Sequence, residues 1–249
     1  VLEWLKNDLD RVSNDYLIVL NQHIPILSDV DRNAPKHNVD NRQELFDIVE
    51  GRKVLALAGH THTVSHFLPG DELEGWGQAT PIHETIIGAA CGSWWSGDFD
   101  DGGIPASYMR CGAPRGHMIF SFDRNRYSNV YKAHNKPVSK QMNLAFLTDE
   151  FIDWFDRRKA GDTTATINDL EFKDILRADN LSSARLVANV WGASMNDAVY
   201  CQVDNRRPVR AEWKFDTKDP YALALQLYVL RGVPGFRLWD KQWDGGVFT

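Results

Sequence analysis

The sequence predicts an α/β layered domain over residues 1–137, followed by a mostly-β domain of the sandwich type over residues 138–249. Helical and extended apolar patterns alternate in the first part, which is typical of a sheet with at least partly parallel strands. The character of the sequence changes after Pro137. Short apolar runs separated by turn residues then follow, and this pattern favours a small β-sandwich.

The elements of the first part follow from the spacing of its apolar residues. Leucines recur at helical spacing over residues 1–12, and the short apolar run at residues 16–20 then predicts a buried strand. A polar loop at residues 28–41 precedes a helix over residues 42–50, which Gly51 is placed to terminate. Further strands are expected at residues 54–58 and 82–90, and a hairpin at residues 117–122 and 127–133.

The second part is predicted to consist mainly of short strands. Residues 150–182 are polar, with some helical character around residues 151–155. Strands are expected at residues 186–191, 199–203 and 209–215, and Asp204-Asn205 supplies a turn between the last two. Trp191 and Trp213 lie on these strands and are expected to be core aromatic residues.

The composition is that of an ordinary folded protein, with 43% hydrophobic residues and a net charge of -6. No basic stripe marks a nucleic-acid interface, and no apolar run approaches the roughly 20 residues that span a bilayer. The sequence begins within a predicted amphipathic helix, without a signal peptide or a start methionine, so we expect a processed or truncated protein. Three cysteines form no disulfide framework and leave the compartment open.

Histidines follow two of the predicted buried strands. His23 comes after the first strand, and His60 and His62 come after the second. Ligands collect beyond the carboxyl ends of strands in α/β sheets. Alternating residues of extended backbone point to one side, so we expect His60 and His62 to face one site. Neutral imidazole binds transition metals well, and we favour a metal site over three hydrogen-bonded loop histidines.

These histidines also carry a resemblance to a known family. Residues 21–25, Asn-Gln-His-Ile-Pro, and residues 59–62, Gly-His-Thr-His, resemble two sequence blocks of the calcineurin-like metallophosphoesterases. Residues 91–95, 103–105, 112–116 and 186–191 resemble a bacterial subgroup that has its own C-terminal β-sandwich domain. The resemblance implies the C-terminal half of a layered αββα domain before that sandwich. It favours a periplasmic or other extracytoplasmic location in a bacterium.

The resemblance further implies a two-metal phosphoester hydrolase that acts on a phosphomonoester or phosphodiester with Mn, Fe or Zn. His23 and His60 would bind one ion and His62 the other, and none of the three would act as a proton donor. The family's Asp-x-His, Gly-Asp and Gly-Asn-His-Asp/Glu blocks are not found in the chain. We therefore expect a C-terminal portion that is incomplete as a hydrolase, with the missing N-terminal segment as a possible partner. The alternative is a non-catalytic binding or cell-surface module with a vestigial phosphoesterase fold, so whether the chain itself is an enzyme stays open.

Several other residues are candidates for a role. Trp94 and Trp95 would either line one wall of a substrate-binding site or anchor a long loop to the core. Nearby carboxylates could add polar contacts: Asp98, Asp100 and Asp101. Cys91 and Cys111 flank this loop as a disulfide or as two thiols. The remaining histidines are expected to be structural, core or surface residues: His37, His66, His83, His117 and His134.

Overall fold

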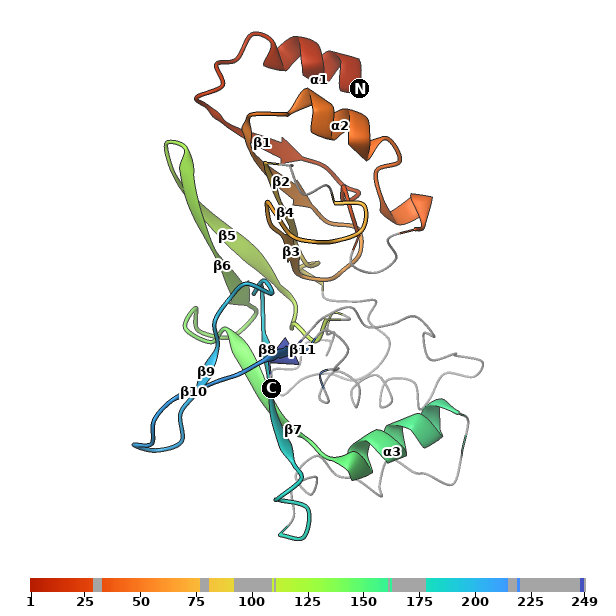
Figure 1. The fold of residues 1–249 in the computed structure, drawn as a ribbon, viewed down its shortest axis with the longest axis vertical. Coiled ribbons are helices and arrows are strands. Elements are labelled where there is room, and N and C mark those ends of the chain that lie inside the picture. Colours follow the sequence, from red (N-terminus) through yellow and green to blue (C-terminus); the bar gives the residue numbers. More distant parts are fainter. Residues whose placement is uncertain are drawn as a thin grey trace.

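A computed structural model describes residues 1–28, 33–76, 81–91, 109, 111–160, 162, 178–214, 219 and 247–248. Over these residues the fold combines mixed sheets with three α-helices (Figure 1). None of the helices in the described ranges is long and apolar enough to cross a membrane.

The first part of the chain forms a four-stranded sheet in the order β1-β2-β4-β3. Its strands are β1 (Leu17–Asn21), β2 (Lys53–Ala58), β3 (Ser65–Phe67) and β4 (Ile82–Ile86). β1, β2 and β4 run parallel, whereas β3 pairs antiparallel with β4. The sheet is therefore partly parallel, as predicted. The short strand β3 was not predicted, because three residues are too few for an alternating pattern to stand out.

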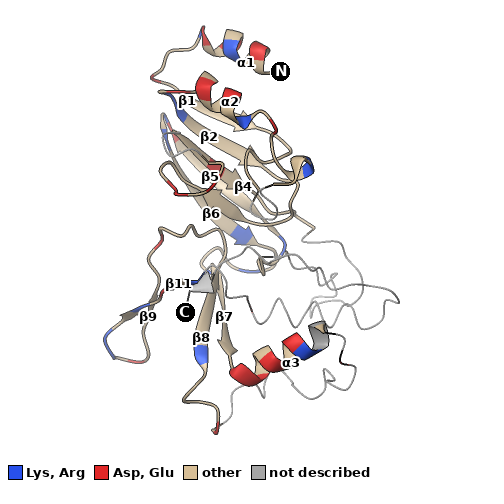
Figure 2. Cartoon of the chain, turned by 45° about the vertical axis from the view of Figure 1, so that its right-hand side comes forward, with Lys and Arg blue, Asp and Glu red and all other residues tan. Residues whose placement is uncertain are grey.

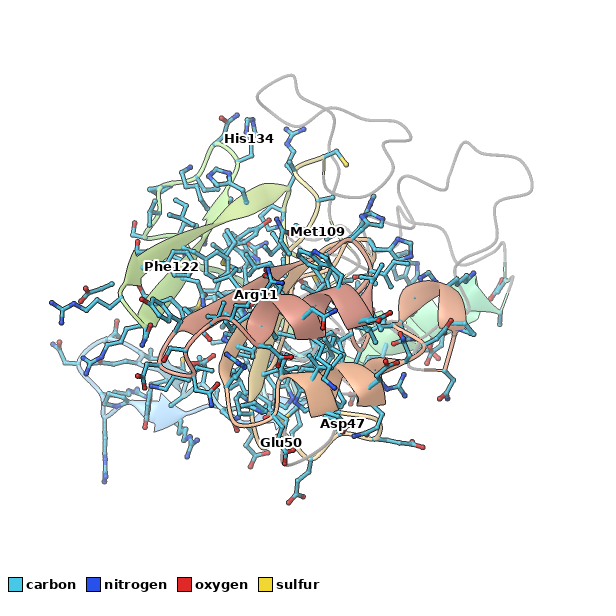
Figure 3. All side chains as sticks on the ribbon, turned by 90° about the horizontal axis from the view of Figure 1, so that it is seen from above. Arg11, Asp47, Glu50, Met109, Phe122 and His134 are labelled. Atoms are coloured by element: carbon cyan, nitrogen blue, oxygen red, sulfur yellow. The ribbon has the colours of Figure 1, made fainter. Side chains whose placement is uncertain are left out.

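Helices α1 (Leu2–Leu9) and α2 (Arg42–Ile48) cover one face of this sheet. Their apolar side chains form one buried core with the sheet, which includes Leu9, Leu45, Phe46, Val54, Ala56, Ile82 and Ile86. The acidic residues of these helices, red in Figure 2, are exposed: Glu3, Asp8, Glu44 and Asp47. Asp47 and Glu50 lie on the outer side of the molecule (Figure 3). This is the amphipathic arrangement that the helical spacing of the leucines predicts.

The hairpin of β5 (Gly116–Asp123) and β6 (Arg126–Ala133) lies beside the sheet (Figure 1). Its Tyr127 hydroxyl lies 2.6 Å from Nδ1 of His83 on β4. Its turn residue Asn125 accepts a hydrogen bond from the Leu17 amide at 3.1 Å. Because neighbouring residues of a strand point to opposite faces, His83 faces the hairpin while Glu84 faces the helices. The sheet thus lies between the helices and the hairpin.

The remaining strands form a second four-stranded sheet and a separate pair. The sheet has the order β11-β12-β8-β7, with antiparallel pairs, and the pair is β10-β9. Their bounds are β7 (Met142–Leu147), β8 (Arg185–Val190), β9 (Tyr200–Cys201), β10 (Val209–Arg210), β11 (Trp213–Lys214) and β12 (Val247–Phe248). Helix α3 (Asp149–Lys159) contains the predicted helical segment. The strand expected at residues 209–215 is divided between β10 and β11, and β7 was not predicted.

Contacts join the residues before and after position 137. Trp191 is buried in one apolar cluster with Val64 and Tyr131. Asn196 Nδ2 donates to Asp71 Oδ1 at 3.1 Å. The domain division at residue 137, the layered αββα arrangement and the β-sandwich stay predictions.

Candidate metal centre

The carboxyl ends of β1 and β2 bring two predicted metal ligands together. Because these strands are parallel neighbours, the loops that follow them leave from the same edge of the sheet. His60 Nδ1 lies 3.1 Å from His23 Nε2, and the two ring centroids are 5.0 Å apart. The Gly59 amide also donates to the His23 carbonyl at 3.1 Å, which ties the two loops together. The predicted approach of His23 and His60 is therefore observed.

The loop after β2 is not the extended segment that was expected. His60 has a φ of 69° and His62 a φ of 56°, so both lie in the left-handed region. Residues other than glycine are uncommon there, and such backbone strain gathers at functional sites. Thr61 and Thr63 are buried, and their hydroxyls lie 2.8 Å apart. The reasoning from strand alternation was thus wrong, and the assignment of His62 to the same site stays a prediction.

A further histidine, His37, joins this edge. Its Nδ1 lies 3.1 Å from His60 Nε2, with ring centroids 5.1 Å apart. His60 therefore contacts His23 with one ring nitrogen and His37 with the other. His37 was expected to be a core or surface residue, and its contact with His60 was not predicted. It lies on the short helix η1 (Pro35–His37) within the polar loop, where no local pattern marked it.

Glu84 positions the loop that carries His23. This residue is fully buried, with 0% of its surface exposed. Its carboxyl oxygens accept hydrogen bonds from the amides of Ile26 at 2.6 Å and Leu27 at 3.1 Å. A buried carboxyl group is costly unless it is hydrogen-bonded, so these amides and Glu84 stabilise one another. The loop after β1 is therefore fastened to β4 three residues beyond His23.

Asn38 fastens the segment that carries His37 to the same loop. Its Oδ1 accepts from the Ser28 amide at 2.7 Å, and its Nδ2 donates to the Ala34 carbonyl at 2.7 Å. The Val39 amide donates to the Pro25 carbonyl at 3.0 Å. These bonds hold the backbone directly after His37 against the loop of His23 and join it to Ala34 before His37.

The geometry of the histidine pair fits part of a metal site. If each nitrogen lay about 2.1 Å from one ion, a separation of 3.1 Å would give an angle of about 95° at the metal. This angle lies close to octahedral coordination. However, the described residues contain no group of three or more His, Cys, Asp or Glu side chains able to hold a metal. The pair therefore supplies two ligands and requires others.

A second histidine chain runs through the interior between the sheet and the hairpin. His66 Nδ1 lies 2.9 Å from His83 Nε2, and His83 Nδ1 lies 2.6 Å from the Tyr127 hydroxyl. The Thr85 hydroxyl lies within 3.3 Å of both histidines. His83 was expected to be structural, and it makes structural contacts. The pairing of His66 with it was not predicted, because the pairing depends on β3.

Burial sets the electrostatics of this interior chain. Burial, together with His83, lowers the pKa of His66 to about 4, and Asp197 and the Gly192 carbonyl oppose that change. Burial also lowers the pKa of His83 to about 4, against the effect of Asp71. Burial raises the pKa of Tyr127. All three groups are therefore neutral near pH 7.

Other predicted site residues divide into two groups. Trp94, Trp95, Asp98, Asp100 and Asp101 lie outside the described residues. The cysteines lie within them and carry no disulfide, so the thiol alternative for Cys91 and Cys111 is confirmed. His117 and His134 are exposed on the hairpin and at its end, and Figure 3 shows His134 away from α1 and α2.

Comparison with known proteins adds one finding. The family model "C terminal of Calcineurin-like phosphoesterase" matches residues 84–230. The match begins within β4, so His23, His37, His60 and His62 precede it. No curated protein matches the sequence. Because the family match spans more than half of the sequence, the chain belongs to the calcineurin-like phosphoesterases and carries their C-terminal domain.

Proposed function

We propose that the protein is a metal-dependent phosphoester hydrolase and that the edge of its first sheet forms part of a two-metal site. The observation that carries this proposal is the approach of His60 Nδ1 to His23 Nε2 within 3.1 Å at the ends of two parallel strands. Membership of the family supports a phosphoester substrate and divalent metal ions. In this proposal His23 and His60 hold one ion and His62 takes part in holding the other.

Divalent ions at such a site polarise a phosphoryl oxygen and lower the pKa of bound water, and Mn, Fe and Zn all suit imidazole ligands. The residues of this chain orient the ligands. Glu84 fixes the loop of His23 through the amides of Ile26 and Leu27. The left-handed backbone at His60 turns the second loop sharply at the end of β2. Preorganised ligands of this kind are what a metal site needs.

The proposal also includes the remaining metal ligands, a substrate wall and the domain architecture. Carboxylate and asparagine ligands of the family site would come from a segment N-terminal to Val1 or from another chain. Trp94 and Trp95 remain the proposed substrate wall. The layered αββα domain to residue 137 and the β-sandwich after it remain the proposed architecture.

Metal binding by the 249-residue chain tests the histidine site. Titration with Zn²⁺ or Mn²⁺ should show weak binding that His60→Ala reduces by at least about 10-fold, because a direct ligand is lost. His134→Ala is the matched control, since this histidine is exposed at the end of the hairpin. Equal affinity for His60→Ala and His134→Ala would overturn the site.

Turnover separates the hydrolase from the binding-module alternative. The chain alone, with Mn²⁺ or Zn²⁺, should hydrolyse p-nitrophenyl phosphate no faster than His60→Ala, because the part of the chain that the structure describes holds no group of three or more metal-binding side chains. Adding a segment with the missing family motifs should produce metal-dependent turnover. If that addition gives metal binding without turnover, the non-catalytic binding module becomes the better description.

A further inference from the structure

The imidazole of His60 is in contact at both of its nitrogens, and this limits where its proton can lie. Nδ1 lies 3.1 Å from His23 Nε2, and Nε2 lies 3.1 Å from His37 Nδ1. A neutral imidazole has one N–H donor and one lone pair. When His60 Nδ1 uses its lone pair for a metal, its proton must lie on Nε2. The group placed to accept that proton's hydrogen bond is His37 Nδ1.

We infer that His37 is a positioning residue for the metal site. Its Nδ1 accepts a hydrogen bond from His60 Nε2 and so fixes the tautomer and ring orientation of His60. This inference rests on the proposed function, because it assumes that His60 is a ligand. Metal-bound histidines generally donate their second N–H to a neighbouring acceptor, and losing that acceptor weakens metal binding. Here the acceptor is itself a histidine, with its own proton on Nε2.

The backbone around His37 is built to hold this acceptor in place. Pro35 restricts the backbone at the first position of η1. Asn38, directly after His37, is buried and bonds both Ser28 and Ala34. These bonds join the segment to the loop that carries His23. The distance between His37 and His60 is therefore set by hydrogen-bonded backbone. A histidine whose neighbouring residue is held by these bonds suits a preorganised site.

Two substitutions at His37 test the inference by the affinity of the chain for Zn²⁺. His37→Leu removes the acceptor and should weaken binding by about 10-fold or more. His37→Asn places its Oδ1 at the same position along the side chain as Nδ1, so it should recover most of the affinity. His134→Ala should bind like the unaltered chain. Thermal unfolding without metal should be similar for all variants, because His37 is only partly buried.

The outcomes separate this inference from the proposed function. If His60→Ala binds Zn²⁺ as tightly as the unaltered chain, the metal site itself is wrong. If His60→Ala weakens binding but His37→Leu does not, or if His37→Asn is as weak as His37→Leu, the inference about His37 is overturned. Nitrogen-15 NMR of the Zn²⁺-bound chain gives a further readout. The His60 proton should be found on Nε2, and a proton on Nδ1 would contradict the inference.

Discussion

Two histidine clusters of the same sheet differ in what surrounds them. The edge cluster consists of His23, His37 and His60, which lie in loops at the carboxyl ends of β1 and β2 and within η1. The interior chain consists of His66, His83 and Tyr127, which lie on β3, β4 and β6. The ring contacts are of similar length, 3.1 Å in the edge cluster and 2.9 Å in the interior chain. Contact distance alone therefore does not distinguish a ligand site from a structural one.

The difference lies in access and in backbone. His23 is exposed, and His60 lies in the left-handed region on a loop. In contrast, His66 and His83 lie on regular strands, and the Nε2 atom of His66 is buried. For both histidines burial outweighs the nearby carboxylates Asp197 and Asp71, so it keeps the imidazoles neutral and makes their protonation costly. The edge cluster therefore suits a ligand from solvent, while the interior chain joins elements of the fold.

The largest expected effect is a loss of the protein's free energy of unfolding in acid, caused by the two histidines of the interior chain. The folded pKa of His66 and of His83 lies near 4, below the ordinary value of 6.5, so the unfolded chain binds more protons between these pH values. The contribution of these histidines to stability should be full above about pH 6.5, fall as the pH drops from 6.5 to 4, and level off below 4. The cost is about 3 kcal/mol for one such histidine. Urea unfolding at a series of pH values measures it.

His66→Gln provides the comparison for this acid effect, because glutamine does not ionise in this range. Its free energy of unfolding should fall less than that of the unaltered chain between pH 7 and pH 4.5. His134→Gln, at an exposed position, should follow the unaltered chain. Identical pH curves for His66→Gln and the unaltered chain would show that the interior chain does not carry the acid sensitivity.

The sequence could predict the edge cluster in part, because two of its residues follow apolar runs that end in recognisable blocks. His23 and His60 are placed by strands whose pattern is local. His37 could not be predicted in the same way, since it reaches His60 only through the fold of a polar loop. Glu84 was hidden inside a predicted strand, where its position suggested no bond to the amides of Ile26 and Leu27.

The fold divides along the same line. The strands β1 and β2 were predicted close to their observed bounds, because each is a continuous apolar run. The strands β3 and β7 were missed. β3 has only three residues, and β7 exists through its antiparallel pairing with β8, which is distant in sequence. The interior chain depends on β3, so it could not be predicted before that strand was known.

An intermediate effect is expected at Glu84, the residue that fastens the edge cluster. Glu84→Ala leaves the amides of Ile26 and Leu27 without their acceptor in a buried position, which should cost about 1–3 kcal/mol for each amide left unsatisfied. Zn²⁺ affinity should also fall, because the loop of His23 loses its attachment to β4. Chemical unfolding and metal titration of the same samples measure both changes.

Glu84→Gln sharpens this prediction because it retains one acceptor oxygen. It should lose less stability and less Zn²⁺ affinity than Glu84→Ala. A loss of stability without any loss of affinity in Glu84→Ala would show that the loop of His23 keeps its position without this residue.

The smallest expected effect is that of Tyr127→Phe in the interior chain. This substitution removes only the hydroxyl that lies 2.6 Å from His83 Nδ1, and it keeps the ring that stacks on His83 with centroids 5.7 Å apart. Because burial raises the pKa of Tyr127, its hydroxyl keeps its proton at neutral pH and lies within hydrogen-bond distance of His83 Nδ1. Loss of one such bond should lower the free energy of unfolding by about 1 kcal/mol.

The proposed separation of the clusters requires that Zn²⁺ affinity stay unchanged, within the error of the titration. Tyr127→Phe and Tyr16→Phe should be compared, since Tyr16 is exposed and its hydroxyl should contribute little. If Tyr127→Phe instead weakens Zn²⁺ binding as strongly as His37→Leu, the interior chain is coupled to the edge cluster through β4, and the two clusters act as one unit.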